Sequence, residues 1–207
     1  MGRILIADDH PLFRAALQAA VQRALPEVST IECESLGAVQ AQLRASADIM
    51  LVLLDLKMPD CEGFAGLLAL RSEFPAAPVV VVSATEDSAT VQRAMAFGAA
   101  GFIPKSTPLV TMGSALRAIL DGDSWAPNLD ELHAPAAIEA GIAALTPAQL
   151  KILIGLQRGS LNKQIAHEMG VTEATIKAHL TAIFRKLGVH NRTQAVIAAQ
   201  SLSVGVE

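Results

Sequence analysis

Apolar and polar positions follow two alternating periods along the front of the chain. Short apolar runs, most of them without polar alternation, predict buried strands over residues 3–7, 28–32, 48–54, 79–83 and 101–103. Between them, apolar positions at helical spacing predict helices over residues 11–25, 36–45, 63–74, 88–97 and 108–121. Five strand–helix units in a row predict an α/β fold whose doubly wound, five-stranded parallel sheet carries helices on both faces.

The rest of the chain has no strand pattern. Residues 122–143 are broken by prolines and rich in alanine, which indicates a linker with room for a short helix near its end. From Thr146 and Pro147, a capping residue followed by proline, the spacing is helical, and helices end at Gly159, Gly170 and Gly188. We therefore predict a domain over residues 1–121, a linker over 122–143 and an all-α, four-helix domain over 144–207.

Three carboxylates are predicted to meet at one edge of the sheet. Asp8 and Asp9 follow the first strand and Asp55 follows the third, and these strands are neighbours at the switch point of a doubly wound sheet. A single acid could merely cap the next helix, but three together repel one another unless a cation joins them, and oxygen ligands of this kind suit Mg²⁺. Ser83 and Lys105, after the fourth and fifth strands, would complete a site for a phosphoryl group.

The same residues carry a resemblance to a known family. Residues 3–121 resemble the flavodoxin-like receiver domains of two-component response regulators, with DDHPLFR at 8–14, DLKMP at 55–59, and then Gly63, Ser83 and Lys105. The segment DDHPLFR at 8–14 is similar to the NarL/FixJ class in particular. The resemblance implies that Asp8, Asp9 and Asp55 hold Mg²⁺ and that Asp55 accepts the phosphoryl group. It also implies that Ser83 and Lys105 contact that group and that Ser83 and Phe102 act as the switch residues.

The chain departs from the family pattern at three places. Asp60 and Glu62 add two acids where small residues are usual, which puts extra negative charge beside the predicted pocket. Phe102 lacks the hydroxyl of a tyrosine, and Pro104 stands where an aliphatic residue is commoner. None of these changes removes a chemical group that the predicted site needs.

The C-terminal helices have the spacing of a helix-turn-helix unit. Apolar residues of the helix after Thr172 share one face, and the opposite face offers Glu173, Lys177, Ala178, Thr181 and Arg185 to a major groove. The pattern by itself is also typical of an ordinary helical bundle with a solvated basic face. Residues 143–200 resemble the LuxR-type DNA-binding domain, which implies that Lys177, Ala178 and Thr181 face bases. It also implies that five further residues lie near phosphates: Asn162, Lys163, Thr175, His179 and Arg192.

Charge divides the chain in the same way. Residues 1–144 hold 9 basic and 17 acidic side chains, whereas residues 145–207 hold 7 basic and 3 acidic ones. A basic C-terminal part after an acidic N-terminal part suggests that only the C-terminal part binds a polyanion. The opposite charges also suggest that the receiver domain masks the basic domain before phosphorylation. The two cysteines form no metal-ligand pattern, and no apolar run approaches the length of a membrane span, so we expect a cytoplasmic protein without a membrane partner.

These features predict a DNA-binding transcription regulator that is controlled by phosphorylation of an aspartate, and not an enzyme. The expected partners are a sensor histidine kinase or phosphotransfer protein, double-stranded DNA and a second copy of the chain. One alternative keeps DNA binding but makes the receiver an unphosphorylated scaffold or ligand sensor. A further alternative, a phosphatase with Asp55 as nucleophile, is disfavoured because Lys57 stands where such enzymes have a general acid.

Overall fold

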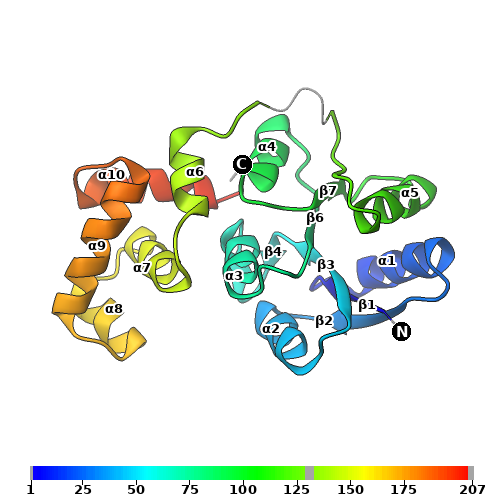
Figure 1. Ribbon diagram of the computed structural model, residues 1–207, viewed down its shortest axis with the longest axis horizontal. Coiled ribbons are helices and arrows are strands. Elements are labelled where there is room, and N and C mark those ends of the chain that lie inside the picture. Colours follow the sequence, from blue (N-terminus) through cyan, green and yellow to red (C-terminus); the bar gives the residue numbers. More distant parts are fainter. Residues whose placement is uncertain (1, 129–132, 205–207) are drawn as a thin grey trace.

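A five-stranded parallel sheet forms the centre of the front domain in the computed structural model, which describes residues 2–128 and 133–204, without the side chain of Glu62 (Figure 1). The strands lie in the order β2-β1-β3-β6-β7, so β1 and β3 are neighbours as predicted. Their bounds are β1 (Arg3–Ala7), β2 (Ser29–Cys33), β3 (Ile49–Asp55), β6 (Val79–Ser83) and β7 (Gly101–Pro104). The predicted α/β fold class is confirmed.

Helices cover both faces of this sheet. One face carries α1 (Pro11–Ala24) and α5 (Leu109–Leu120), whose Leu17, Val21 and Leu116 pack with Ile4 and Leu51 of the strands. The other face carries α2 (Leu36–Ala45), α3 (Ala65–Glu73) and α4 (Ser88–Ala96). A short hairpin of β4 (Lys57–Met58) and β5 (Cys61–Glu62) joins β3 to α3, directly after Asp55. The strands end at the edge where the predicted site lies.

The C-terminal domain is helical, as predicted. It contains α7 (Pro147–Gln157), α8 (Asn162–Met169), α9 (Glu173–Leu187), α10 (Arg192–Ala199) and the 3₁₀ turn η2 (Gln200–Leu202). The glycines after α8 and α9 have positive φ angles, which is the usual left-handed end of a helix. Gln149 caps α7 together with Thr146 and accepts a hydrogen bond from Lys186 Nζ at 2.8 Å. The amide therefore joins α7 to α9 without a carboxylate.

The predicted linker contacts both domains. Its first part lies along the edge of the sheet, where Trp125 forms a parallel bridge with Gly101 and its carbonyl accepts the Phe102 N–H at 2.8 Å. Its last part forms α6 (Ala137–Ala143), which contacts α4 of the front domain and α9 of the other. Residues 129–132 of the linker lie outside the described residues.

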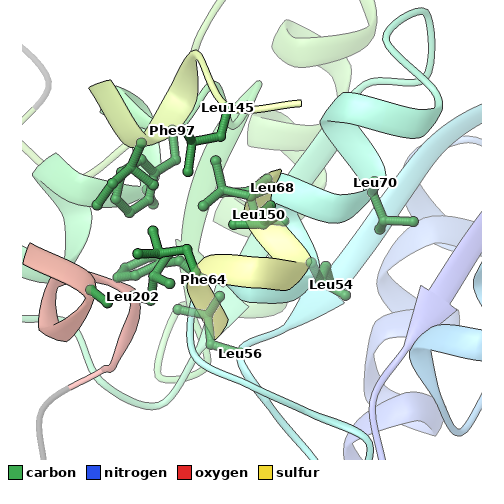
Figure 2. Packing of buried hydrophobic residues seen from close by; sticks show 14 of the residues in the cluster. Leu54, Leu56, Phe64, Leu68, Leu70, Phe97, Leu145, Leu150 and Leu202 are labelled. Carbon is green, nitrogen blue, oxygen red and sulfur yellow. The ribbon is translucent and has the colours of Figure 1, made fainter. Parts of the chain in front are cut away.

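One apolar cluster runs from the α3–α4 side of the front domain into the helical domain. Figure 2 shows Leu145, Leu150 and Leu202 beside Phe64 and Leu68, and all five belong to a single buried cluster. The two domains are therefore docked, with α7, α6 and the C-terminal turn against the front domain (Figure 1). Among the residues described, no helix has the length and apolar character needed to span a bilayer.

Asp87 provides a test of pH-dependent stability at the start of α4. Its carboxylate accepts hydrogen bonds from the Thr90 hydroxyl at 2.6 Å and the Thr90 N–H at 2.9 Å, and these bonds lower the pKa of Asp87. The stability that Asp87 contributes is therefore present above its unfolded pKa of about 3.9 and is lost as the pH falls through its lower folded pKa.

We expect Asp87→Ala to lower the free energy of unfolding by about 1 kcal/mol at neutral pH, because a helix cap is lost. Urea denaturation should show that this difference shrinks in acid. Asp87→Asn is the control, since its amide still caps the helix but does not titrate. A constant difference between alanine and wild type at every pH would contradict the assignment of the cap to an ionised carboxylate.

Candidate functional site

The structure brings the predicted carboxylates together at the end of β1 and β3. Asp8 is fully buried, Asp55 is 4% exposed, and Asp9 is partly exposed. One ligand atom from each of Asp8, Asp9, His10 and Asp55 lies within 4.8 Å of the others. This convergence follows from the parallel pairing of β1 with β3, which aligns Ala7 with Leu54, one residue before each buried acid.

Lys105 lies between the two buried carboxylates. Its Nζ is 2.6 Å from Asp8 Oδ2 and 2.8 Å from Asp55 Oδ2, and it also lies 4.6 Å from the centre of the Phe13 ring. The loop after β7 holds this lysine, since its backbone N–H donates to the Ser83 carbonyl at 2.8 Å. The ammonium therefore compensates part of the negative charge that the fold buries here.

The protonation states reflect this competition between burial and charge. Burial raises the pKa of Asp55, and the hydrogen bond from Lys105 offsets only part of that effect. Burial opposes the charge on Lys105, but the attraction of the Asp55 and Asp8 carboxylates outweighs burial and raises the pKa of the ammonium. A further cation near Asp55 would favour its carboxylate form, which is the nucleophilic form.

The carboxylates fit a divalent cation. In the part of the chain that the structure describes, the buried oxygens Asp8 Oδ2 and Asp9 Oδ1 accept no hydrogen bond of good geometry. Lys105 Nζ forms an ion pair with Asp8 Oδ2, and His10 Nδ1 lies 2.7 Å from Asp9 Oδ1. Oxygen donors with lone pairs of this kind, open to solvent through Asp9, form the hard ligand set that Mg²⁺ prefers.

The two predicted switch residues lie on adjacent strands. Ser83 is buried at the end of β6, and its hydroxyl accepts the Thr85 N–H at 3.1 Å. Phe102 is buried in β7, and its backbone N–H holds the start of the linker through Trp125. Their roles remain predictions, but Phe102 joins β7, the strand that ends just before Lys105, to the segment that leads to the second domain.

Arg14 is a residue whose contribution sequence reasoning missed. It is buried, its Nη1 donates to the Asp8 carbonyl at 2.8 Å, and its Nε and Nη2 donate to Glu32 and Glu34, also at 2.8 Å. The guanidinium thereby holds the backbone at the end of β1 against β2 and faces the acidic cluster with a positive charge. A signal was available, since Arg14 stands on the inward face of the first helix, where a charge needs partners.

Asp60 makes a contact that the sequence did not indicate. The extra acid was expected to add charge beside the pocket, and in the structure its two oxygens accept the Leu36 and Gly37 N–H groups at 3.0 and 3.1 Å. It therefore supports the start of α2, where the free N–H groups of a helix favour an anion. Sequence alone could not indicate this, because the two segments are far apart along the chain.

The helix-turn-helix unit leaves its predicted reading face open. Ile176, Leu180, Ile183 and Leu187 are buried along one side of α9, whereas Lys177, Ala178, Thr181 and Arg185 are exposed on the other. In Figure 1, α8 and α9 lie on the side of the helical domain away from the front domain. The front domain does not cover this face in the described conformation, because α6, α7 and the C-terminal turn make the contact instead.

The residues predicted near phosphates fall into two groups. Lys163 is exposed on α8, and Thr175 and His179 are partly exposed on α9. Arg192 is engaged within the protein, since its Nη1 donates to Asn162 Oδ1 at 3.2 Å and its Nη2 to the Ser160 carbonyl at 2.6 Å. This pair joins α10 to the start of α8, so Asn162 and Arg192 have a structural role whatever they contact in DNA.

Comparisons with known proteins give two family matches, one in each part of the chain. The family described as "Response regulator receiver domain" matches residues 4–117, and "Bacterial regulatory proteins, luxR family" matches residues 143–199. A glycerol metabolism activator of Pseudomonas putida is 42% identical, with 96% of this chain and 95% of that protein covered. The nitrate/nitrite response regulator NarP of Escherichia coli K12 is 31% identical, with 94% and 93% covered.

Solved structures share the fold. RcsB from Salmonella enterica serovar Typhimurium, bound to promoter DNA in the presence of a phosphomimetic, superimposes with a TM-score of 0.58. The two sequences are 22% identical, and the match covers 98% of this chain and 99% of that one. At this identity the likeness concerns the arrangement of a receiver and a helical domain.

Proposed function

The chain belongs to the response regulators that join a receiver domain to a luxR-family DNA-binding domain, and from this premise we propose that phosphorylation of Asp55 controls its action on DNA. The observation that carries the proposal is the convergence of Asp8, Asp9, Asp55 and Lys105 at one edge of the sheet. An unphosphorylated scaffold would not need three acids and a lysine there, since burying them costs stability.

The proposed reaction is a single phosphoryl transfer. A carboxylate oxygen of Asp55 attacks the phosphorus atom of a phosphohistidine or a small phosphodonor, and the bond from phosphorus to the leaving group breaks, with its electron pair leaving on that group. The product is an acyl phosphate on Asp55. Asp8, Asp9 and Asp55 would hold Mg²⁺, which neutralises charge on the phosphoryl oxygens. Lys105 and Ser83 would contact its remaining oxygens.

The proposed partners follow from the two domains. A sensor histidine kinase or phosphotransfer protein would supply the phosphoryl group, and double-stranded DNA would bind the α9 face. One helix-turn-helix unit buries little DNA, so we expect two copies of the chain on paired half-sites. We propose a cytoplasmic location, where both partners are available.

Selection of DNA fragments by the purified protein, with and without acetyl phosphate and Mg²⁺, would test this function. The fragment pool should include genomic DNA near genes of glycerol metabolism, because the 42% identical relative is named as an activator of that process. We expect enrichment of specific fragments with the phosphodonor. Enrichment that is the same without it, or with Asp55→Asn, would favour the scaffold alternative.

Two lysines of the helix-turn-helix unit should behave differently. Lys177 is exposed on the predicted reading face of α9, whereas Lys163 is exposed on α8. Lys177→Ala should weaken binding to the selected site by about 1–3 kcal/mol and relax preference at one base pair. Lys163→Ala should weaken all sequences alike and flatten the dependence on salt. Identical profiles in a binding titration would contradict the assigned reading face.

A further inference from the structure

We propose that a cavity between the two domains is a binding site for a small organic anion that carries an apolar body. The cavity has a volume of about 820 Å³ and lies between α2 and α3 of the front domain and α7 of the helical domain. Protein sites for small molecules have volumes of roughly 300–1,000 Å³. Asp8, Asp9 and Asp55 are not among its described lining residues, so this ligand site is separate from the proposed phosphoryl site.

The walls of the cavity are apolar and incompletely covered. Ala65 and Ala69 line it one turn apart on α3, and Leu150 and Ile154 line it one turn apart on α7. The side chains of the two alanines end at Cβ, which leaves space between the helices. Leu150 is buried, whereas Ala65, Ala69 and Ile154 keep part of their surface exposed. An apolar group that fills the space removes this surface from water, which is favourable.

The acids of the cavity already have partners within the protein. Glu73 forms an ion pair with Arg44 and accepts a hydrogen bond from Gln40 Nε2 at 2.9 Å. Asp60 uses both carboxylate oxygens at the start of α2. Among the lining side chains that the structure describes, the negative charges are therefore satisfied without a ligand.

Two basic side chains of the cavity are not engaged in this way. Lys151 lies in α7, and Arg158 directly follows its last residue, two turns or about 10 Å further along the helix axis. Ile154 lies between them, and both basic side chains are exposed. Within the part of the chain that the structure describes, neither side chain has a hydrogen-bond or ion-pair partner. These cations can hold an anionic head group while an apolar body lies against Ile154.

Charge and shape together select the class of ligand. A small inorganic anion would meet the two cations but would leave the apolar walls in contact with water. A cation would be repelled by Lys151 and Arg158. An organic carboxylate with an apolar chain matches both the charge and the walls. Because the walls come from both domains, residues of α3 and residues of α7 should both affect its binding.

Calorimetric titration of the full chain with decanoate, below the concentration at which it forms micelles, would measure this binding. Octanoate should bind about 10-fold more weakly, because two fewer methylene groups leave water. Decyltrimethylammonium, which has a similar chain and the opposite charge, should bind at least about 10-fold more weakly than decanoate. Equal affinity for the two decyl compounds would show that the basic side chains do not select the ligand, and would overturn the proposal.

Variants on both walls would locate the site. Lys151→Gln and Arg158→Gln should each weaken decanoate binding by about 5-fold. Arg23→Gln is the matched control, since Arg23 is exposed on α1, which covers the opposite face of the sheet. Ala69→Leu should weaken binding by more than about 10-fold, because the added atoms fill the cavity. Ala41→Leu is its control, at an exposed position of α2 outside the cavity.

Thermal unfolding with and without decanoate gives a second readout for the same variants. Decanoate should raise the unfolding temperature of the wild-type chain, and the rise should be smaller for Lys151→Gln and Arg158→Gln. If Ala69→Leu does not fold, these two charge variants decide by themselves, because their side chains are exposed and lie outside the core. Absence of decanoate binding to the wild-type chain, or binding that neither charge variant weakens, would overturn the proposal.

Discussion

Acetyl phosphate with Mg²⁺ is expected to add one phosphoryl group to the wild-type chain and none to the Asp55→Asn variant. Asp55 ends β3 with a carboxylate oxygen 2.8 Å from Lys105, and an asparagine amide in its place is not a nucleophile of this kind. Intact-mass measurement under acidic conditions, where an acyl phosphate survives longer, would check the result. An equal adduct on Asp55→Asn would contradict the assignment.

The Asp9→Ala variant is the companion to this experiment. It removes one of the proposed Mg²⁺ ligands but leaves the Asp55 nucleophile in place. Its adduct should be much weaker at low Mg²⁺ and should recover in part as Mg²⁺ is raised, because the remaining carboxylates still bind the metal less tightly. Loss that no concentration of Mg²⁺ relieves would indicate that Asp9 acts otherwise.

Lys105→Met is expected to lower the free energy of unfolding by about 3 kcal/mol at neutral pH without divalent metal. The lysine lies within 2.8 Å of Asp8 and Asp55, so its loss leaves two buried carboxylates without their counter-ion. Hydrogen bonds raise the pKa of Lys105 despite its burial. The contribution of Lys105 to the stability of the fold is therefore complete below its unfolded pKa of about 10.4, which includes neutral pH. It is lost as the pH rises through the higher pKa of the folded state.

Urea denaturation with a chelator present would measure this effect. Lys57→Met is the matched control, because Lys57 is exposed on the hairpin directly after Asp55. Combining Asp55→Asn with Lys105→Met should cost less than Lys105→Met alone, since one of the unpaired carboxylates is then removed. Equal losses for Lys57→Met and Lys105→Met would show that the buried charges are compensated in another way.

The docked arrangement changes how phosphorylation could control DNA binding. Attraction between an acidic front and a basic end suggested that the receiver masks the DNA-binding domain before phosphorylation. Instead, the contact is an apolar cluster that includes Leu150 and Leu202, together with backbone bonds to Phe64 and Arg93. Apolar contacts of this kind are less sensitive to salt than an electrostatic mask would be. Control through the orientation of the DNA-binding domain fits the exposed α9 face better than electrostatic masking of that domain does.

Local patterns in the sequence determined the secondary structure and much of the candidate site. The sequence indicates each strand of the five-stranded sheet within one or two residues, and for the strands other than the edge strand β2 the reason is that burial on both faces demands continuous apolar runs. Parallel topology then brings the strand ends together, so Asp8, Asp55 and Lys105 could be predicted to converge. The apolar face of α9, from Ile176 to Leu187, followed from helical spacing in the same way.

Only the tertiary structure decided how distant segments use their polar groups and how the two domains meet. The bonds of Arg14 to Glu32 and Glu34, and of Asp60 to the start of α2, join residues with no common local pattern. The contact of Leu202 with Phe64 depends on a backbone approach that only Gly63 permits, and nothing near either segment in the sequence specifies its partner. Periodicity reports which face of an element is buried, whereas the identity of the covering element depends on the shapes of both surfaces in three dimensions.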